Sequence, residues 1–294
     1  MKIFVYEDVK YRNFLPLTYL RPVFDLICGV TSFYNRIKFI YGDVVRLSRF
    51  DRIEPVQGLY INGRAILRKK LPEPKGNTLY LYKSHIVGFY TNSTLTIEFP
   101  VNEENLKEIL SNFNSVEVDV TLVEYPWDII RINGDELLKD FELFRLKRIK
   151  LPKGVWVDEE KGPVIISPFA KINPPTFIEG PSFIERETIV DGAKIRRGTT
   201  IGRNCRIGGE VESSIFMNYS NKHHEGFVGH SYIGEWVNLG ALTTTSDLKN
   251  TYGTVKVQTP SGEIDTGLIK LGSIIGDHTK TGIGTLLNTG SIIG

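Results

Sequence analysis

Residues 178–208 read IEGPSFIERETIVDGAKIRRGTTIGRNCRIG, and this stretch repeats itself about every six residues. Each repeat opens with a branched aliphatic residue, and one repeat is a residue short. The opening residues are Ile178, Ile184, Val190, Ile195, Ile201 and Ile207. The pattern returns as aliphatic-glycine pairs at 233–234, 239–240, 275–276 and 293–294. A hexad repeat of this kind is typical of a parallel β-helix.

A period of six fits the two-residue alternation of strands and does not fit a helix with 3.6 residues per turn. Each hexad can form one short strand and a corner, with its aliphatic residue pointing into a narrow interior. Glycine often follows, because it permits corner dihedrals and a close backbone approach. One coil cannot bury its own apolar edge, so coils must stack about 4.8 Å apart to enclose a core. We therefore predict a parallel β-helix over the second half of the chain.

The composition fits a two-domain protein without a nucleic-acid or membrane partner. The chain has 294 residues, and its 36 basic and 34 acidic residues give a net charge of +2. The N-terminal MKIFVYEDVKYR carries acids where a signal peptide needs an apolar run, and no run approaches the roughly 18 residues of a membrane span. Cys28 and Cys205 lie far apart in sequence. We expect a cytoplasmic protein in which both are buried small hydrophobic residues.

The first half of the chain has the pattern of an α/β domain. Strands are expected at residues 2–6, 59–62, 79–82, 94–98 and 116–123. One helix is expected over 103–110 with Asn102 as its N-cap, and a second over about 135–148 with Asp135 as its N-cap. Beyond the second helix the sequence changes to Pro, Gly and isolated aliphatic residues. We predict a boundary near residue 150, with domains over 1–150 and 151–294.

Two stretches interrupt the hexads, at about 211–227 and about 243–268. A solenoid projects such insertions as loops, often on its binding face. The chain stops at Gly294 within a hexad, and exposed coil ends are prone to aggregation. We therefore expect either a shortened chain or a partner that covers this end.

Residues 228–250, VGHSYIGEWVNLGALTTTSDLKN, and residues 269–276, IKLGSIIG, carry the most specific pattern of the chain. Gly-His, Tyr-aliphatic-Gly, Val-Asn-aliphatic-Gly-Ala and Thr follow one another in this order. The pattern resembles the acetyltransferase half of the bifunctional family that makes UDP-N-acetylglucosamine, in which a glucosamine-1-phosphate N-acetyltransferase is joined to a pyrophosphorylase. The resemblance covers roughly residues 155–294 and implies that the β-helix is left-handed.

The resemblance implies roles for single residues of the second half. His230 takes the position of the general base, and a reference pKa of about 6.5 suits histidine to this role. The other implied roles are phosphate contacts by Arg196 and Lys270, sugar contacts by Tyr232 and Asn238, and a lining position of the acetyl-CoA site at Ala241. The chain departs from the family at Leu242, where the family has glycine.

A zinc site is an alternative for the histidines of this half. His223, His224 and His230 lie close in sequence, and some left-handed β-helices hold zinc with three histidines from separate coils. The next histidine upstream is His85, in the other domain, and zinc needs three or four ligands at fixed geometry. We therefore favour the acetyltransferase interpretation over a zinc site.

Residues 14–27, FLPLTYLRPVFDLI, resemble part of the sugar nucleotidyltransferase signature. The opening LPLTYLRP, the INGR segment at 61–64 and the PWD segment at 126–128 match a shortened branch of that family over about residues 1–145. The chain lacks the Gly-rich loop that normally follows the first strand, where it has EDVKYRN, and the family's lysine position holds Val23.

This second resemblance also implies site residues. Arg21 is the candidate phosphate contact, and Asp25 and Asp128 are candidate Mg²⁺ carboxylates. Salt-bridged surface acids are the alternative for both carboxylates.

The two resemblances imply a homotrimeric enzyme of nucleotide-sugar biosynthesis, in which an α/β nucleotidyltransferase-like domain precedes a left-handed parallel β-helix. The expected reactions are acetyl-CoA-dependent N-acetylation of an amino-sugar 1-phosphate of the glucosamine 1-phosphate type, and Mg²⁺-dependent nucleotidyl transfer from UTP or another nucleoside triphosphate onto a sugar 1-phosphate. The alternative is a non-catalytic sugar-nucleotide-binding or scaffold protein. Val23, the missing glycines and Leu242 favour that alternative.

Overall fold

The computed structural model describes residues 1–51, 56–146, 149–259 and 262–294. The chain divides into two compact units. Unit 1 comprises Met1–Phe14, Arg21–Leu26 and Thr31–Glu124, and unit 2 comprises Leu15–Leu20, Ile27–Val30 and Tyr125–Gly294. Two short N-terminal segments therefore fold with the C-terminal half, which no sequence pattern indicates. The domain boundary near residue 150 stays a prediction.

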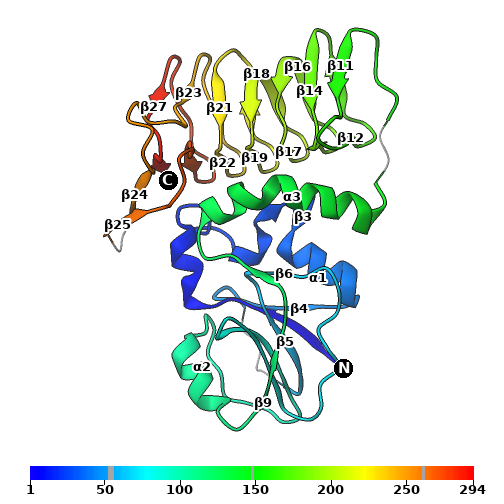
Figure 1. Ribbon diagram of the computed structural model, residues 1–294, viewed down its shortest axis with the longest axis vertical. Helices are drawn as coiled ribbons and strands as arrows, with labels where there is room; N and C mark the ends of the chain where they lie inside the picture. The colour runs from blue at the N-terminus through cyan, green and yellow to red at the C-terminus, as the bar shows by residue number, and fades with distance from the viewer. Residues whose placement is uncertain (52–55, 147–148, 260–261) are drawn as a thin grey trace. The chain divides into compact units, whose positions relative to one another are not determined.

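Unit 1 is built on a six-stranded sheet with the order β4-β1-β5-β8-β7-β9 (Figure 1). Strand β1 runs parallel to β4 and β5, whereas β8 runs antiparallel to both β5 and β7. The strands of the sheet are β1 (Ile3–Tyr6), β4 (Val45–Leu47), β5 (Gly58–Asn62), β7 (Thr78–Tyr82), β8 (His85–Thr91) and β9 (Asn114–Glu117). The other elements of unit 1 are η1 (Val9–Phe14), η2 (Val23–Asp25), β3 (Thr31–Ser32), α1 (Phe33–Tyr41), β6 (Ala65–Ile66), α2 (Glu103–Ile109) and β10 (Thr121–Leu122).

A stack of three aromatic rings fixes the register of the central strands. Phe4, Tyr60 and Phe89 occupy directly paired positions on β1, β5 and β8. The ring centroids of Phe4 and Tyr60 are 4.6 Å apart, and those of Tyr60 and Phe89 are also 4.6 Å apart. All three side chains are buried. Because a slip of one residue would move each ring to the opposite face, this stack opposes a shift of register.

Most expected elements of unit 1 are confirmed. The strands expected at 2–6, 59–62 and 79–82 are present, and Asn102 caps α2 by accepting hydrogen bonds from the backbone N–H groups of Glu104 and Asn105. The prediction of a strand at 94–98 is wrong, because this stretch packs Ile97 against the core but pairs with no strand. The strand expected at 116–123 is divided into β9 and β10, which lie in separate sheets.

Unit 2 contains the expected parallel β-helix. One sheet has the order β12-β15-β17-β19-β22-β26-β28, and a second has the order β11-β14-β16-β18-β20, with β13 and β21 pairing alongside (Figure 1). Ile178, Ile195, Val211 and Val228 are successive partners in the second sheet, so the coils advance by 17, 16 and 17 residues. Three hexads therefore make one coil, and the chain has the expected fold class of an α/β domain followed by a β-helix.

The strands of unit 2 are short. They are β2 (Ile27–Cys28), β11 (Val155–Asp158), β12 (Val164–Ile166), β13 (Lys171–Asn173), β14 (Thr176–Glu179), β15 (Ser182–Ile184), β16 (Ile189–Ile195), β17 (Thr199–Ile201), β18 (Arg206–Glu212), β19 (Ile215–Phe216), β20 (Asn221–Lys222), β21 (Phe227–Gly229), β22 (Tyr232–Ile233), β23 (Thr244–Thr245), β24 (Lys256–Thr259), β25 (Gly262–Asp265), β26 (Ile274–Ile275), β27 (Leu286–Leu287) and β28 (Ile292–Ile293).

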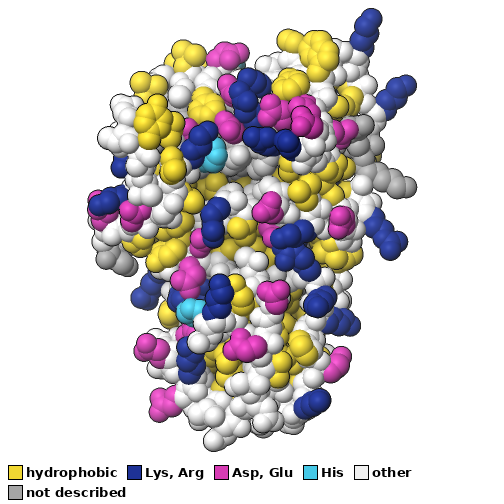
Figure 2. Space-filling model, viewed as in Figure 1, with side chains coloured by type: hydrophobic (Ala, Val, Ile, Leu, Met, Phe, Trp, Pro, Cys, Tyr) yellow, Lys and Arg dark blue, Asp and Glu magenta, His cyan; other side chains and the backbone are white. Residues whose placement is uncertain are grey.

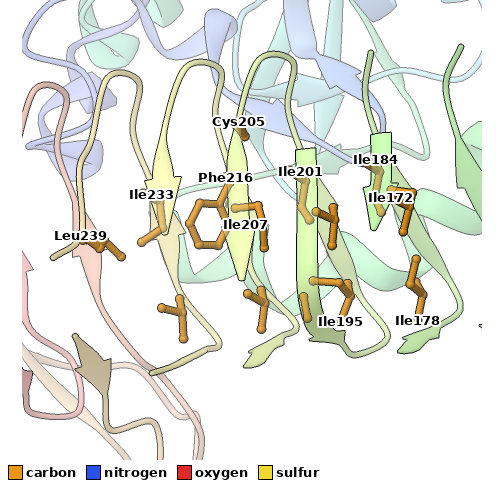
Figure 3. Close-up of a cluster of buried hydrophobic side chains, with 14 of the residues drawn as sticks. Ile172, Ile178, Ile184, Ile195, Ile201, Cys205, Ile207, Phe216, Ile233 and Leu239 are labelled. Atoms are coloured by element: carbon orange, nitrogen blue, oxygen red, sulfur yellow. The ribbon is translucent and has the colours of Figure 1, made fainter. Parts of the chain in front are cut away.

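The interior of the β-helix is a continuous stack of aliphatic side chains (Figure 3). All six aliphatic residues that open the hexads are completely buried. Both cysteines are buried as expected, and burial raises the pKa of the Cys205 thiol to about 12. The hexad pattern thus identifies the core of this unit residue by residue.

One corner of the β-helix carries aromatic side chains stacked from coil to coil. Tyr219, Trp236 and His278 take left-handed backbone conformations, with φ near 60° at each. The rings of Tyr219 and Trp236 are parallel within 7° with centroids 4.5 Å apart, and Trp236 also stacks on His278 at 6.5 Å. Left-handed backbone strains a non-glycine residue. Ring stacking offsets part of that strain.

The two expected interruptions differ in the structure. The stretch 211–227 is not an insertion, because β18, β19, β20 and β21 continue the coils without a break. The sequence of this stretch lacks the aliphatic-glycine pairs of the other hexads, which is why it resembles an interruption. In the structure, Phe216 and Lys222 occupy buried positions of the coils there. The second stretch is an insertion, since β24 and β25 form an antiparallel hairpin between Leu248 and Lys270, which bridge to each other.

Helix α3 (Pro126–Phe144) starts nine residues earlier than expected. Pro126 takes the first turn, and Asp128 accepts a hydrogen bond of 3.0 Å from the backbone N–H of Tyr125, which forms a capping box. Asp135 therefore lies inside the helix and is not its N-cap. The helix ends before Arg145, which has a left-handed backbone, and the expected last residues 147–148 lie outside the described residues.

A buried amide holds α3 against the β-helix. The Asn133 side chain donates hydrogen bonds to the Gly198 carbonyl oxygen at 2.9 Å and to Thr200 Oγ1 at 3.0 Å. Its Oδ1 accepts a hydrogen bond of 2.7 Å from the backbone N–H of Gly29. Gly134 follows and lies close to Gly198, because a Cβ at position 134 would be only 3.5 Å from the Gly198 Cα. The helix can approach the coil this closely because both contact positions are glycine.

Acidic and basic side chains are intermingled on the visible surface (Figure 2), in keeping with the net charge of +2. Among the described residues, no helix combines the length and the apolar character that crossing a membrane requires.

Lys222 is an unexpected charge inside the β-helix. It pairs with the buried Ile207 in the strand register, and the residue is only 1% exposed. Its Nζ donates a hydrogen bond of 2.6 Å to the His224 carbonyl oxygen. Burial lowers the pKa of Lys222 from 10.5 to about 8. The folded state therefore binds this proton more weakly than the unfolded state does, and stability rises as the pH rises from about 8 to about 10.5.

We predict that Lys222→Met stabilises the protein at pH 7, where the buried ammonium is charged. A pKa difference of about 2.5 (10.5 − 8) corresponds to about 3 kcal/mol, and the lost hydrogen bond offsets part of this gain. Thermal unfolding followed by circular dichroism at pH 7 and pH 10 would measure it, with the exposed Lys171→Met as control. The variant should also lose the rise in stability above pH 8. A lower Tm for Lys222→Met at pH 7 would show that the ammonium is stabilising.

Candidate functional site

Unit 2 contains a cavity of about 520 Å³ between α3 and one corner of the β-helix. All of its lining residues belong to this unit. Helix α3 contributes Ile130, Arg131, Gly134, Asp135 and Leu138, and the coils contribute Arg197, Gly198, Ser213, His230 and Lys270 among others. The cavity thus brings together two of the residues predicted from the sequence, His230 and Lys270.

The backbone of stacked coils positions His230. The residue follows β21, and its backbone N–H donates to the Glu212 carbonyl oxygen at 2.9 Å. Its own carbonyl oxygen accepts from the Gly272 N–H at 2.9 Å. A Cβ at position 272 would lie 2.0 Å from the Gly229 oxygen, so only glycine fits there. This contact places the coil that carries Lys270 directly against the coil that carries His230.

Asp247 orients the His230 ring. His230 Nδ1 lies 2.7 Å from Asp247 Oδ2, and the two side chains are 18% and 11% exposed. Burial alone would raise the pKa of Asp247, but the hydrogen bond to His230 and the charges of His230 and Lys270 lower it below its usual value. Because Nδ1 donates to the carboxylate, neutral His230 keeps the Nε2 lone pair for a proton. Sequence reasoning missed Asp247, although 247 − 230 is 17, the length of one coil.

The cavity is predominantly basic. Arg131, Lys161, Arg197 and Lys270 line it, and Asp135 is its carboxylate outside the His230 pair. Lys270 Nζ lies 3.8 Å from a Glu212 carboxylate oxygen, whereas Arg197 makes no ion pair with any residue that the structure describes. Such a cavity can bind a small anion such as a phosphate monoester.

Other predicted residues of the β-helix lie elsewhere. Arg196 is held on the outer face, with its Nε 2.6 Å from Glu210 and its Nη1 3.7 Å from Glu179. Asn238 is exposed and lies outside the named strands, where it makes isolated β-bridges to Asn221 and Lys280. The Ala241 carbonyl oxygen accepts a hydrogen bond of 2.8 Å from the Gly284 N–H. None of these residues lines the cavity that holds His230.

Tyr232 has a structural role that the sequence did not indicate. The residue is completely buried, and its hydroxyl donates to the Ile27 carbonyl oxygen at 2.9 Å and accepts from the Ile27 N–H at 2.7 Å. Both hydrogen-bonding functions are therefore used within unit 2. The predicted sugar contact by Tyr232 does not fit this geometry, and we correct it.

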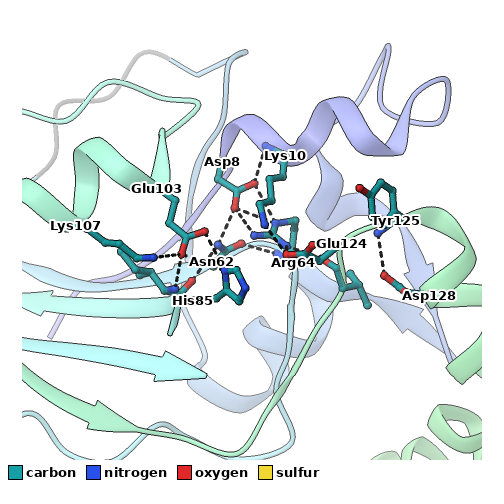
Figure 4. A network of polar contacts seen from close by, with 12 residues as sticks. Asp8, Lys10, Asn62, Arg64, His85, Glu103, Lys107, Glu124, Tyr125 and Asp128 are labelled. Carbon is teal, nitrogen blue, oxygen red and sulfur yellow. Dashed lines mark hydrogen bonds and ion pairs between the residues drawn. The ribbon is translucent and has the colours of Figure 1, made fainter. Parts of the chain in front are cut away.

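Unit 1 has a second polar cluster at the carboxyl ends of β1 and β5 (Figure 4). Arg64 is completely buried and donates to Asp8 through Nε at 2.9 Å and Nη2 at 2.7 Å. Asn62 donates to the same carboxylate at 3.0 Å. A cavity of about 380 Å³ opens beside Asp8 and is lined by Lys10, His85, Glu103 and Lys107 among others. Open α/β sheets bind ligands at the carboxyl ends of parallel strands, so this is the candidate site of unit 1.

The segment EDVKYRN, which stands where the family has a Gly-rich loop, is held in place by the carboxylate of its first residue, Glu7. Glu7 is buried, accepts a hydrogen bond of 3.1 Å from the Val23 backbone N–H and forms an ion pair with Arg49. Burial raises the pKa of Glu7 despite that ion pair. The Val23 side chain is buried, so it does not face a ligand. Arg21 contributes its carbonyl oxygen to Arg49, at 3.0 Å, and its predicted phosphate contact stays a prediction.

The two carboxylates predicted to bind Mg²⁺ have other partners. Asp25 pairs with Arg46 at 2.5 Å, and Asp128 caps α3 and lies 3.5 Å from Arg131. They belong to different units. Each of the two carboxylates thus has a partner within the protein, and the Mg²⁺ role of each stays a prediction.

Two of the histidines of the zinc alternative have other partners among the described residues. His223 lies 3.2 Å from Asp191, and His230 is engaged by Asp247. Over residues 1–51, 56–146, 149–259 and 262–294, no group of three or more His, Cys, Asp or Glu side chains is placed to hold a metal ion.

Parts of this chain are similar to known proteins. A profile of a family described as sugar nucleotidyl transferase matches residues 3–149, which is 147 of 294 residues. A bifunctional sugar-1-phosphate nucleotidylyltransferase/acetyltransferase of Sulfurisphaera tokodaii is 40% identical over 85 residues, 29% of this chain and 21% of its own. The bifunctional protein GlmU of Methanocaldococcus jannaschii is 42% identical over 74 residues, 25% and 18% of the two chains. The matches thus span about a fifth of the length of these curated relatives.

We predict that Asp247→Asn lowers the free energy of unfolding at pH 7 by about 1 kcal/mol, because it removes a partly screened charged hydrogen bond. The pKa of Asp247 is lowered in the folded state, so its contribution is present above the unfolded pKa and is lost as the pH falls through the folded value. Urea unfolding at pH 7 and pH 3 should therefore show a smaller difference between wild type and variant at pH 3 than at pH 7. The exposed Asp119→Asn is the control. An equal difference at both pH values would contradict this account.

Proposed function

The chain belongs to the sugar nucleotidyl transferase family, and from this premise we propose that its β-helix performs a second transfer, the N-acetylation of an amino-sugar 1-phosphate by acetyl-CoA. The observation that carries this proposal is the His230–Asp247 pair at 2.7 Å in a basic cavity. The sequence pattern around His230 and the name of the Sulfurisphaera tokodaii relative support it.

The residues of the cavity fit the needs of amide formation. Bound acetyl-CoA supplies an acetyl group activated as a thioester. His230 accepts a proton at Nε2 from the acceptor amine, while Asp247 holds the ring through Nδ1 and stabilises the imidazolium that forms. Lys270 and Arg197 face the same cavity and bind the acceptor's phosphate. The proton then leaves with the thiol, so the reaction gives an N-acetyl sugar phosphate and free CoA.

For unit 1 we propose nucleotidyl transfer at the cavity beside Asp8. Lys10 and Lys107 line this cavity together with His85, and the two lysines are the cations that would bind an incoming triphosphate there. The buried Arg64–Asp8 pair keeps the strand ends in place beneath them. Pyrophosphate release from UTP and a sugar 1-phosphate tests this proposal. A loss of release in Lys10→Gln supports it, whereas wild-type protein that binds UTP without release supports the non-catalytic alternative.

His230→Ala tests the acetyl transfer. We predict that it lowers kcat/KM by at least about 100-fold, because it removes the general base, and that Asp247→Asn lowers it by about tenfold or more. Release of free thiol from acetyl-CoA in the presence of glucosamine 1-phosphate is the measurement.

His223→Ala is a matched control, since His223 also pairs with a carboxylate, Asp191, but lies away from the cavity. It should keep wild-type activity. Full activity of His230→Ala would show that His230 is not the general base.

A further inference from the structure

Helix α3 forms one wall of the cavity with two opposite charges. Arg131 and Asp135 stand one turn apart, and both line the cavity from exposed positions. The spacing of four residues corresponds to a rise of about 6 Å along the helix. Neither residue belongs to the sequence pattern that surrounds His230.

Asp135 is available to a ligand. Its side chain makes no hydrogen bond or ion pair with any residue in the described ranges, whereas the other α3 carboxylate near the helix start, Asp128, is used as a cap. Arg131 lies 3.5 Å from Asp128 in a pair that is more than half exposed on the arginine side. A surface pair of this kind is weak and can be exchanged for a ligand's phosphate.

The position of α3 is fixed, so these charges have a defined place relative to His230. Asn133, between them in sequence, is buried and hydrogen-bonded to Gly198, Thr200 and Gly29. Gly198 also lines the cavity. The helix is therefore held rigidly at the middle of the segment that carries Arg131 and Asp135.

We propose that α3 determines acceptor specificity: Asp135 binds the amino group of the acceptor in its ammonium form, and Arg131 binds the neighbouring phosphate together with Arg197. This inference rests on the proposed acetyl transfer at His230. An amino-sugar 1-phosphate carries its amine and its phosphate on neighbouring carbons, a separation of the same order as the helix rise between the two residues. His230 then takes the proton that the amine must lose.

The alternative ligand class is a simple phosphate without an amine. The cavity has four basic side chains, which would attract any phosphate ester. Among the described residues that line the cavity, Asp135 is the carboxylate. A carboxylate binds an ammonium group more strongly than a neutral hydroxyl, so Asp135 can distinguish an acceptor with an amine from one without. Asp135 is therefore the specificity-determining residue, and Arg131 the affinity residue.

Calorimetric binding to the full chain tests this inference with three probes: glucosamine 1-phosphate, glucose 1-phosphate and glucosamine. Wild type should bind glucosamine 1-phosphate about tenfold more tightly than glucose 1-phosphate. Asp135→Asn should reduce that ratio to about one without weakening glucose 1-phosphate. Arg131→Gln should weaken both phosphates about tenfold and leave glucosamine unchanged. Glu142→Gln, an exposed carboxylate of α3 outside the cavity, is the matched control and should change none of the three.

Kinetics separate this inference from the proposed function. If wild type transfers acetyl groups, Asp135→Asn should raise KM for glucosamine 1-phosphate about tenfold with kcat largely kept. An unchanged binding ratio and KM in Asp135→Asn overturn the specificity role and leave acetyl transfer standing. Binding ratios as predicted, in a protein that releases no thiol, support recognition by α3 and refute acetyl transfer. Wild type that binds none of the probes overturns the inference.

Discussion

The buried side chain of Asn133 holds the functional part of unit 2 together. One amide joins α3, the coil at Gly198 and Thr200, and the N-terminal segment at Gly29. Its own amide is completely buried, and a buried amide left without hydrogen bonds costs more free energy than the bonds themselves contribute. The wall of the cavity, and with it the placement of Arg131 and Asp135, depends on this contact.

The two candidate sites are built on different physical principles. In unit 1, buried opposite charges such as Arg64 and Asp8 satisfy one another, and the cavity lies at the edge of that network. In unit 2, an apolar stack fills the interior, and polar groups from several coils line a cavity beside α3. A β-helix thus presents residues from distant parts of the sequence at a spacing that the coil length sets.

The sequence predicted the periodic parts and missed the contacts between parts. Hexads located the interior residues because an inward position must be apolar in every coil. The family pattern singled out His230 and Lys270, which line one cavity, and their roles stay predictions. Asp247 was missed because it belongs to the next coil, and Tyr232 was misassigned because its partner, the backbone of Ile27, is 205 residues away. The early start of α3 was missed because Pro126 and Asp128 were interpreted as a family motif and not as a helix start.

The hairpin of β24 and β25 has a consequence for how this architecture can vary. Asp247 and Lys270 flank it, and the coil resumes with Leu271 donating its N–H to the Asp247 carbonyl oxygen at 2.9 Å. Asp247 and Lys270 are therefore both held by the coil and not by the hairpin. Lengthening a surface loop costs little free energy when its ends stay fixed. The hairpin is thus a natural place to graft a peptide tag or a second domain, because a change in its length leaves Asp247 and Lys270 in place.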